Sequence, residues 1–245
     1  MVKDCDETQA FFGAGLYIND AIQVHQPTVG EIVDMGEAEY YGMLSAFTAV
    51  PSDMIGQLHK AGIRWMDMSD FDLFIMLSRS LPMEATTILF GENIDFTKFE
   101  LYMNKQNQMI FLEDPNGVRI DLNVYTKMAE YIRNMHGIKP KRVRAFNKTT
   151  EKVMVQEALA NLERDKNKPH KPMLRNLVSS MVCSEGFKYD LEGTRNLGIV
   201  AFMDFVKRIG VIKNANQLVM GAYAGNIDVS KISKKEFDWM RDLSE

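Results

Sequence analysis

The chain has 245 residues, of which 46% are hydrophobic and 25% charged, and its net charge at pH 7 is −4. This length and apolar content allow a sizeable core in one large domain or two modest ones, and the composition excludes a disordered, collagen-like or low-complexity protein. The first residues carry acids without a following hydrophobic stretch, and no run approaches the roughly eighteen apolar residues of a membrane span, so we expect a cytoplasmic protein.

In the first half of the chain, turn and capping residues separate runs with strand or helix periodicity. Thr28 and Glu31 form a capping box, in which each side chain satisfies a backbone donor at the start of a helix. The sequence Asp114–Gly117 has strong turn chemistry between strand-forming runs. We therefore predict, in chain order, a hairpin over residues 16–26, helices over 28–50 with an interruption at Gly36, over 51–62 and over 71–81, a small β-meander over 99–122, and an amphipathic helix that ends at Gly137.

The second half begins with the segment IKPKRVRAFN, residues 138–147, which we interpret as a basic linker. Pro169 and Pro172 lie between two helical patterns and break this half into movable parts, because proline cannot continue a helix. A second capping box starts at Ser233. Apolar stripes and stop signals predict helices over residues 155–162, 174–181, 197–209 with its end at Gly210, 216–223 and 237–243.

The predicted elements define the fold class as α+β with two modules. An N-terminal α+β module spans residues 1–137, the basic linker spans 138–147, and an all-helical module spans 148–245. The charges agree with this division, because residues 1–99 hold 15 acids and 5 bases whereas residues 139–245 hold 13 acids and 20 bases. The two modules should therefore present surfaces of different charge.

The sequence contains no motif of a known catalytic or cofactor site. It lacks a phosphate-binding loop, a dinucleotide fingerprint and the His or Cys spacing of a zinc site. We expect the two cysteines to be unpaired thiols of a reducing compartment, and the histidines to lie at the surface or in turns. These residues are Cys5, Cys183, His25, His59, His136 and His170.

Three groups of polar residues resemble active sites superficially. Asp67, Asp70 and Asp72 are the densest carboxylate cluster, but helix capping by Ser69 or Asp70 explains them better than a metal does. Asp114 and Asp121 with Lys127 resemble a nuclease hairpin, although the turn accounts for the first of them. Cys183 with His170 resembles a nucleophile and base, but Cys183 continues an apolar stripe and should be a core residue. We therefore expect neither an enzyme nor a cofactor.

Two observations concern binding. The basic segments 139–148 and 166–171 carry the charge needed to contact nucleic-acid phosphates, but the acidic chain favours a solvated surface there. The 18 methionines suit adaptable protein-binding surfaces as well as core filling.

Two stretches of the chain carry a family resemblance. The first is Ile22–Ile32, followed by Glu37–Tyr41 and Pro51–Asp53. The second comprises Ser184–Asp190, Ala201–Ile209, Asn216–Gly225 and Asp238-Trp239. They are similar to the N-terminal and C-terminal regions of a family of tail-assembly chaperones in phages and prophages of Gram-positive hosts.

This resemblance implies a protein that binds the tape-measure protein in the host cytoplasm and keeps its hydrophobic helices soluble while the tail tube polymerises. Such a role needs no catalytic residue. A structural baseplate or tail component of the virion is the nearest alternative, a nucleic-acid-binding phage protein is the alternative of another class, and a homo-oligomer remains open.

We expect the C-terminal module to hold the partner, because its helices have narrow apolar stripes that must be shared with neighbours or with another protein. Methionine-containing grooves with basic rims suit helix-in-groove recognition of an acidic, amphipathic partner. The candidate partner contacts are Phe202, Phe205, Met220, Tyr223 and Trp239.

Overall fold

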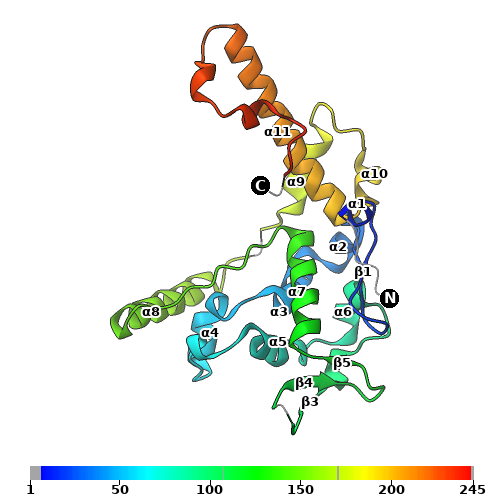
Figure 1. Ribbon diagram of the computed structural model, residues 1–245, viewed down its shortest axis with the longest axis vertical. Coiled ribbons are helices and arrows are strands. Elements are labelled where there is room, and N and C mark those ends of the chain that lie inside the picture. The colour runs from blue at the N-terminus through cyan, green and yellow to red at the C-terminus, as the bar shows by residue number, and fades with distance from the viewer. Residues whose placement is uncertain (1–6, 107, 170, 244–245) are drawn as a thin grey trace.

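The computed structural model, which describes residues 7–106, 108–169 and 171–243, confirms the α+β fold class with a helical C-terminal region (Figure 1). Two small antiparallel sheets accompany the helices. The elements are α1 (Glu7–Phe11), β1 (Leu16–Tyr17), β2 (Gln23–Val24), α2 (Val29–Met35), α3 (Glu37–Thr48), η1 (Pro51–Met54), α4 (Ile55–Lys60), η2 (Trp65–Asp67), α5 (Asp70–Ser78), α6 (Met83–Phe90), η3 (Phe96–Lys98), β3 (Glu100–Met103), β4 (Ile110–Glu113), β5 (Arg119–Ile120), α7 (Leu122–His136), α8 (Lys148–Asp165), α9 (Leu174–Val182), α10 (Leu191–Arg195), α11 (Ile199–Tyr223), η4 (Val229–Lys231) and η5 (Lys234–Phe237).

The predicted hairpin and the first capping box are confirmed. Strands β1 and β2 pair with Leu16 opposite Val24. The N–H of Thr28 donates to Glu31 Oε2 at 2.7 Å, and the N–H of Glu31 donates to Thr28 Oγ1 at 3.2 Å. Gly36, with φ of +96°, separates α2 from α3 at the predicted interruption, since glycine adopts positive φ without steric cost.

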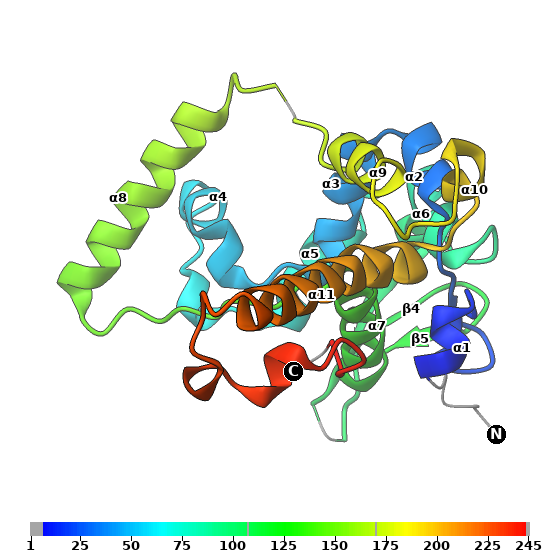
Figure 2. The ribbon, with the colours of Figure 1, turned by 90° about the horizontal axis from the view of Figure 1, so that it is seen from above.

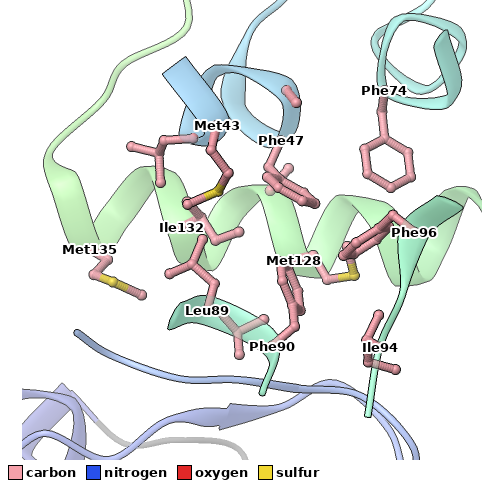
Figure 3. Packing of buried hydrophobic residues seen from close by; sticks show 14 of the residues in the cluster. Met43, Phe47, Phe74, Leu89, Phe90, Ile94, Phe96, Met128, Ile132 and Met135 are labelled. Carbon is pink, nitrogen blue, oxygen red and sulfur yellow. The ribbon is translucent and has the colours of Figure 1, made fainter. Parts of the chain in front are cut away.

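An aromatic core lies between α3, α5, α6 and α7. The rings of Phe47, Phe90 and Phe96 form a triangle with centroid distances of 5.0–5.1 Å. Figure 3 shows these rings packed over Met128 and Ile132 of α7, and both side chains are fully buried. Helix α7 therefore turns its apolar stripe inwards, and it ends as predicted at Gly137 in a left-handed conformation.

The predicted meander is a three-stranded antiparallel sheet with the order β3-β4-β5. The sequence reading missed α6, which follows Pro82 and buries Leu89 and Phe90 in the aromatic core. Eight residues are too few for a clear apolar stripe, so this helix depends on tertiary packing.

Helix α8 belongs by sequence to the second half but packs against α4 in the first. Gly56 of α4 lies so close to α8 that a Cβ there would be 2.5 Å from Leu162 Cδ1 and 3.2 Å from Ala158 O. A second, smaller core forms at this contact from Ile55, Leu58, Trp65, Leu73 and Val155.

The remaining C-terminal helices share the main core. Leu174, Met181, Ile199 and Phe202 are buried in the same cluster as the aromatic residues of the first half. The backbone joins as well, because the N–H of Val29 donates to Leu197 O and the N–H of Ile199 donates to Pro27 O, both at 2.9 Å.

Two predictions for this region were wrong, and one helix was missed. Helix α11 continues through Gly210 to Tyr223 as one helix of 25 residues, where the sequence predicted a stop and a second helix. Glycine in a helix interior costs only about 1 kcal/mol, which the flanking helical residues offset here. Residues 237–243 do not form a helix, and the capping chemistry at Ser233 starts the short 3-10 turn η5 instead. Helix α10 was not predicted.

A candidate partner-binding groove

An apolar groove of about 700 Å³ lies between α2, α9 and α10. We call it the α2–α9 groove. Val33 and Leu191 are exposed at its walls, which shows that the apolar surface is open to solvent. Its apolar lining comes from Val29, Val33, Leu174, Val178, Val182 and Leu191.

The amphipathicity of α9 creates one wall of the groove. Leu174 and Met181 face the core and are buried, whereas Val178 is only half-buried and lines the groove. The apolar stripe of this helix is thus wider than the core requires. Apolar side chains left in solvent beside a cavity are the usual features of a site for another molecule.

Polar contacts at the rim hold the groove open. The Glu37 carboxylate accepts from the N–H of Met173 at 2.6 Å and from the N–H of Leu174 at 3.3 Å, which satisfies backbone donors at the start of α9. The Arg195 guanidinium donates to both oxygens of Asp34 at 2.6 and 2.7 Å. Helices α9 and α10 are therefore fastened to α2 and α3, and the groove exists before any partner arrives.

The structure does not place the five predicted partner contacts in this groove. Phe202 is 0% exposed and is a core residue, so its prediction as a surface contact is corrected. Phe205 is half-buried between Phe11 and Tyr189, with centroid distances of 5.7 and 5.8 Å.

The other three predicted contacts lie on an extension that we call the distal arm, residues 216–243. It comprises the last turns of α11 and the segment that folds back along them, as Figure 1 shows. Met220 is 71% exposed, Tyr223 90% and Trp239 50%. The arm is therefore a second exposed apolar surface, held by bonds from Arg208 to the carbonyl oxygens of Trp239 and Arg241 at 2.7 and 2.8 Å.

The aspartate cluster serves local structure, as predicted. Asp72 Oδ2 accepts from the N–H and the hydroxyl of Ser69, which completes the capping box of α5. Asp70 pairs with Arg142 at 2.5 Å, and Asp67 pairs with Arg64 at 3.0 Å. Across the described ranges, no three His, Cys, Asp or Glu residues are grouped to hold a metal ion.

Asp114 and Asp121, which resemble the carboxylates of a nuclease hairpin in the sequence, also have structural partners. Asp114 Oδ1 accepts from the N–H groups of Asn116 and Val118 at 2.9 and 2.8 Å, and Asp121 caps α7 through the N–H of Val124 at 2.9 Å. Lys127 is exposed on α7. These contacts assign the two aspartates to a turn and a helix start.

One histidine departs from its prediction as a surface or turn residue. His136 is half-buried, its Nδ1 lies 2.9 Å from Ile132 O, and its Nε2 lies 2.7 Å from the Tyr40 hydroxyl. Because a carbonyl oxygen only accepts, Nδ1 carries the proton and Nε2 accepts from Tyr40. Burial lowers the pKa of His136 below its usual value.

The remaining histidines and cysteines complete the comparison. His25 and His59 are exposed, while His170 and Cys5 lie outside the described residues. Cys183 is a free thiol, but it is exposed and lines the α2–α9 groove, so its prediction as a core residue was wrong. It stands at the C-terminal end of α9, where the helix leaves the core.

Sequence reasoning missed the groove because its two walls lie about 140 residues apart, at α2 and at α9–α10. The sequence does hold one local sign of the groove. Val33, on a short capped helix, and Leu191, beside Asp190, are apolar residues that lie outside the stripes assigned to the core.

Comparison with known proteins gives one match. Residues 165–244 match the family model described as the YomV second domain, which covers 80 of the 245 residues. A domain of this type indicates a phage-related protein. No curated protein and no solved structure matches the chain. Among the described residues, the structure has no helix that is both long and apolar enough to cross a membrane.

Proposed function

We propose that this protein is a phage tail-assembly chaperone that binds an amphipathic helix of the tape-measure protein in the α2–α9 groove and keeps that protein soluble in the host cytoplasm. The observation that carries the proposal is the groove itself: a preformed apolar hollow of about 700 Å³ that no part of the described chain fills. Helix-in-groove binding buries the apolar face of a partner helix against such a surface.

Three further features support the proposal. The match to the YomV second domain begins at residue 165 and so includes the α9 and α10 walls of the groove. Arg175 lines the groove, is exposed and forms no ion pair within the described ranges, so it can meet an acidic partner residue. Val33 of α2 and Leu191 of α10 expose apolar surface at the groove walls, where a partner helix would contact it.

Co-expression with the tape-measure protein of the same phage tests this proposal. Val33→Glu and Leu191→Glu put charges on exposed groove positions without touching the core. We expect each to lower the soluble, co-purifying fraction of the partner at least tenfold, because a carboxylate must then be desolvated on binding. Met240→Glu, at an exposed position outside the groove, is the matched control and should leave that fraction unchanged.

The Cys183 thiol gives a direct measure of groove occupancy. In a Cys5→Ser background, the partner should slow alkylation of Cys183 by iodoacetamide, since bound helix covers the groove wall. Substitutions at Met220, Tyr223 and Trp239 that abolish binding while the groove variants do not would move the site to the distal arm. A partner that stays soluble without this protein would contradict the chaperone role and favour a structural baseplate or tail component.

A further inference from the structure

The segment interpreted as a basic linker stretches from α7 to α8 and is bound to the first half of the chain (Figure 1). The N–H of Val143 donates to Ser52 Oγ at 2.8 Å, and the carbonyl of Val143 accepts from the Trp65 indole at 3.3 Å. The N–H of Ala145 lies 3.3 Å from Met66 Sδ. Residues 138–147 have no helix or strand, yet these contacts hold them against η1 and η2.

The side of this segment that faces solvent is cationic and carries one aromatic ring. Val143 and Ala145 are half-buried, whereas Arg142, Arg144 and Phe146 alternate with them and are exposed. Phe146 is 95% exposed, so nothing in the described structure covers its ring. Successive outward side chains of an extended backbone lie roughly 6.6 Å apart.

Residues 139–152 hold six basic side chains and one acid, Glu151. Lys139, Lys141, Arg144, Lys148 and Lys152 form no ion pair within the described ranges of the chain. The neighbouring acids already have partners, because Asp70 pairs with Arg142 and Glu151 pairs with Arg64 at 2.7 Å. We call residues 139–152 the cationic strip.

The strip continues into a second groove at the junction of α4 and α8. This groove has a volume of about 690 Å³, and Lys148 and Lys152 line it together with His59, Arg64 and Glu151, whose carboxylate is paired with Arg64. Lys148 and Lys152 are one helical turn apart and therefore project from the same face of α8. An anionic chain that follows the extended segment past Phe146 reaches this groove next.

We propose that the cationic strip binds single-stranded nucleic acid, with the lysines and Arg144 contacting phosphates and Phe146 stacking on a base. Sequence-independent single-strand sites combine a positive path along the backbone with aromatic rings on which bases stack. A duplex keeps its bases stacked inside and offers none to a lone ring, whereas a single strand can place a base on the exposed face of Phe146. This site goes beyond the proposed chaperone role and shares no residue with the α2–α9 groove.

Fluorescence anisotropy with 20-nucleotide labelled single strands of mixed sequence, on the full-length protein at several salt concentrations, tests the proposal. We expect binding that weakens steeply with salt. The triple variant Lys141→Ala, Arg144→Ala and Lys148→Ala should bind at least tenfold more weakly and reduce the log–log salt slope by about 0.7 per lost phosphate contact. The triple variant Lys231→Ala, Lys234→Ala and Lys235→Ala removes equal charge from the distal arm and should bind like the parent.

Phe146 separates stacking from simple charge attraction. Phe146→Ala should weaken binding about tenfold while leaving the salt slope unchanged, because it removes a stacked base and no phosphate contact. Phe146→Trp should retain binding, and single strands, but not the matching duplex, should quench its emission more than that of the parent, which contains Trp65 and Trp239. Far-UV circular dichroism of each variant verifies the fold.

Several outcomes would overturn the site. Absence of binding by the parent protein at 50 mM salt refutes the proposal directly. Equal losses in the distal-arm control would assign the attraction to net charge alone. An unaffected Phe146→Ala variant, equal affinity for duplex, or a blue-shifted Phe146→Trp emission with anionic vesicles and not with oligonucleotides would each exclude the stacked single-strand mode.

Discussion

The body of the molecule and its C-terminal region use apolar residues in opposite ways. In the body, residues 16–136, the large aromatic side chains of α3, α5 and α6 meet over α7 and are almost fully buried. In residues 174–243, Leu174, Met181, Ile199 and Phe202 are buried in the main core, whereas the distal arm leaves Met220, Tyr223 and Trp239 exposed.

Helix α11 shows the transition within one element. Its first turns bury Ile199 and Phe202 in the main core, and Ala215 is its last buried residue. In Figure 1 the helix runs away from the body, and in Figure 2, seen from above, it crosses in front of α7. The stability of the fold should therefore reside mainly in the body, while the C-terminal region exposes more of its apolar surface.

The largest expected difference is between two aromatic truncations. Phe47→Ala removes a fully buried ring that packs on Phe74, Phe90 and Phe96, and should lower the free energy of unfolding by about 3–5 kcal/mol. Tyr223→Ala removes a ring that is 90% exposed and should change the free energy of unfolding by less than about 0.5 kcal/mol. Urea denaturation measures both, and similar losses would contradict a stability concentrated in the body.

A smaller effect tests the contact between α8 and the body. Gly56→Ala places a methyl group against Leu162 and the Ala158 carbonyl, and overpacking of this kind costs about 1–3 kcal/mol. Gly42→Ala makes the same chemical change inside α3, where a Cβ meets no atom within 4 Å. It should stabilise the protein by about 0.4–1 kcal/mol, because alanine is the better helix former. Hydrogen exchange of α8 should accelerate only in Gly56→Ala.

The smallest expected effect is a pH dependence inside the body. Burial holds the folded-state pKa of His136 below the unfolded value of about 6.5. The unfolded chain therefore takes up a proton before the folded protein does as the pH falls. The stabilisation by neutral His136 is fully present above about pH 6.5 and is lost as the pH falls through the folded-state pKa. Each unit of lowering corresponds to about 1.4 kcal/mol.

Denaturation of the parent and of His136→Gln at pH 7.5 and 5.5 isolates this contribution. The variant lacks the titrating ring, so its stability should fall less between the two pH values than that of the parent. Equal declines would assign the pH dependence to other groups and contradict the burial of His136 against Tyr40.

The amino-acid sequence is sufficient for features that depend on interactions between residues a few positions apart. The capping box of Thr28 and Glu31, the turn at Asp114 and the helix end at Gly137 were all predicted and formed, because each depends on hydrogen bonds between close neighbours in the chain. The α+β class followed from these signals and from the periodicity between them.

The tertiary structure alone decided which apolar and cationic residues remain available. Phe202 and Tyr223 are both aromatic residues of α11, yet Phe202 is buried because the helix starts against the body and Tyr223 is exposed because the helix ends away from it. The α2–α9 groove needs walls that the chain supplies about 140 residues apart. The cationic strip is rigid because Ser52 and Trp65, distant in sequence, bind the backbone of Val143. Contacts between such distant segments depend on how the whole chain packs, which local propensity does not specify.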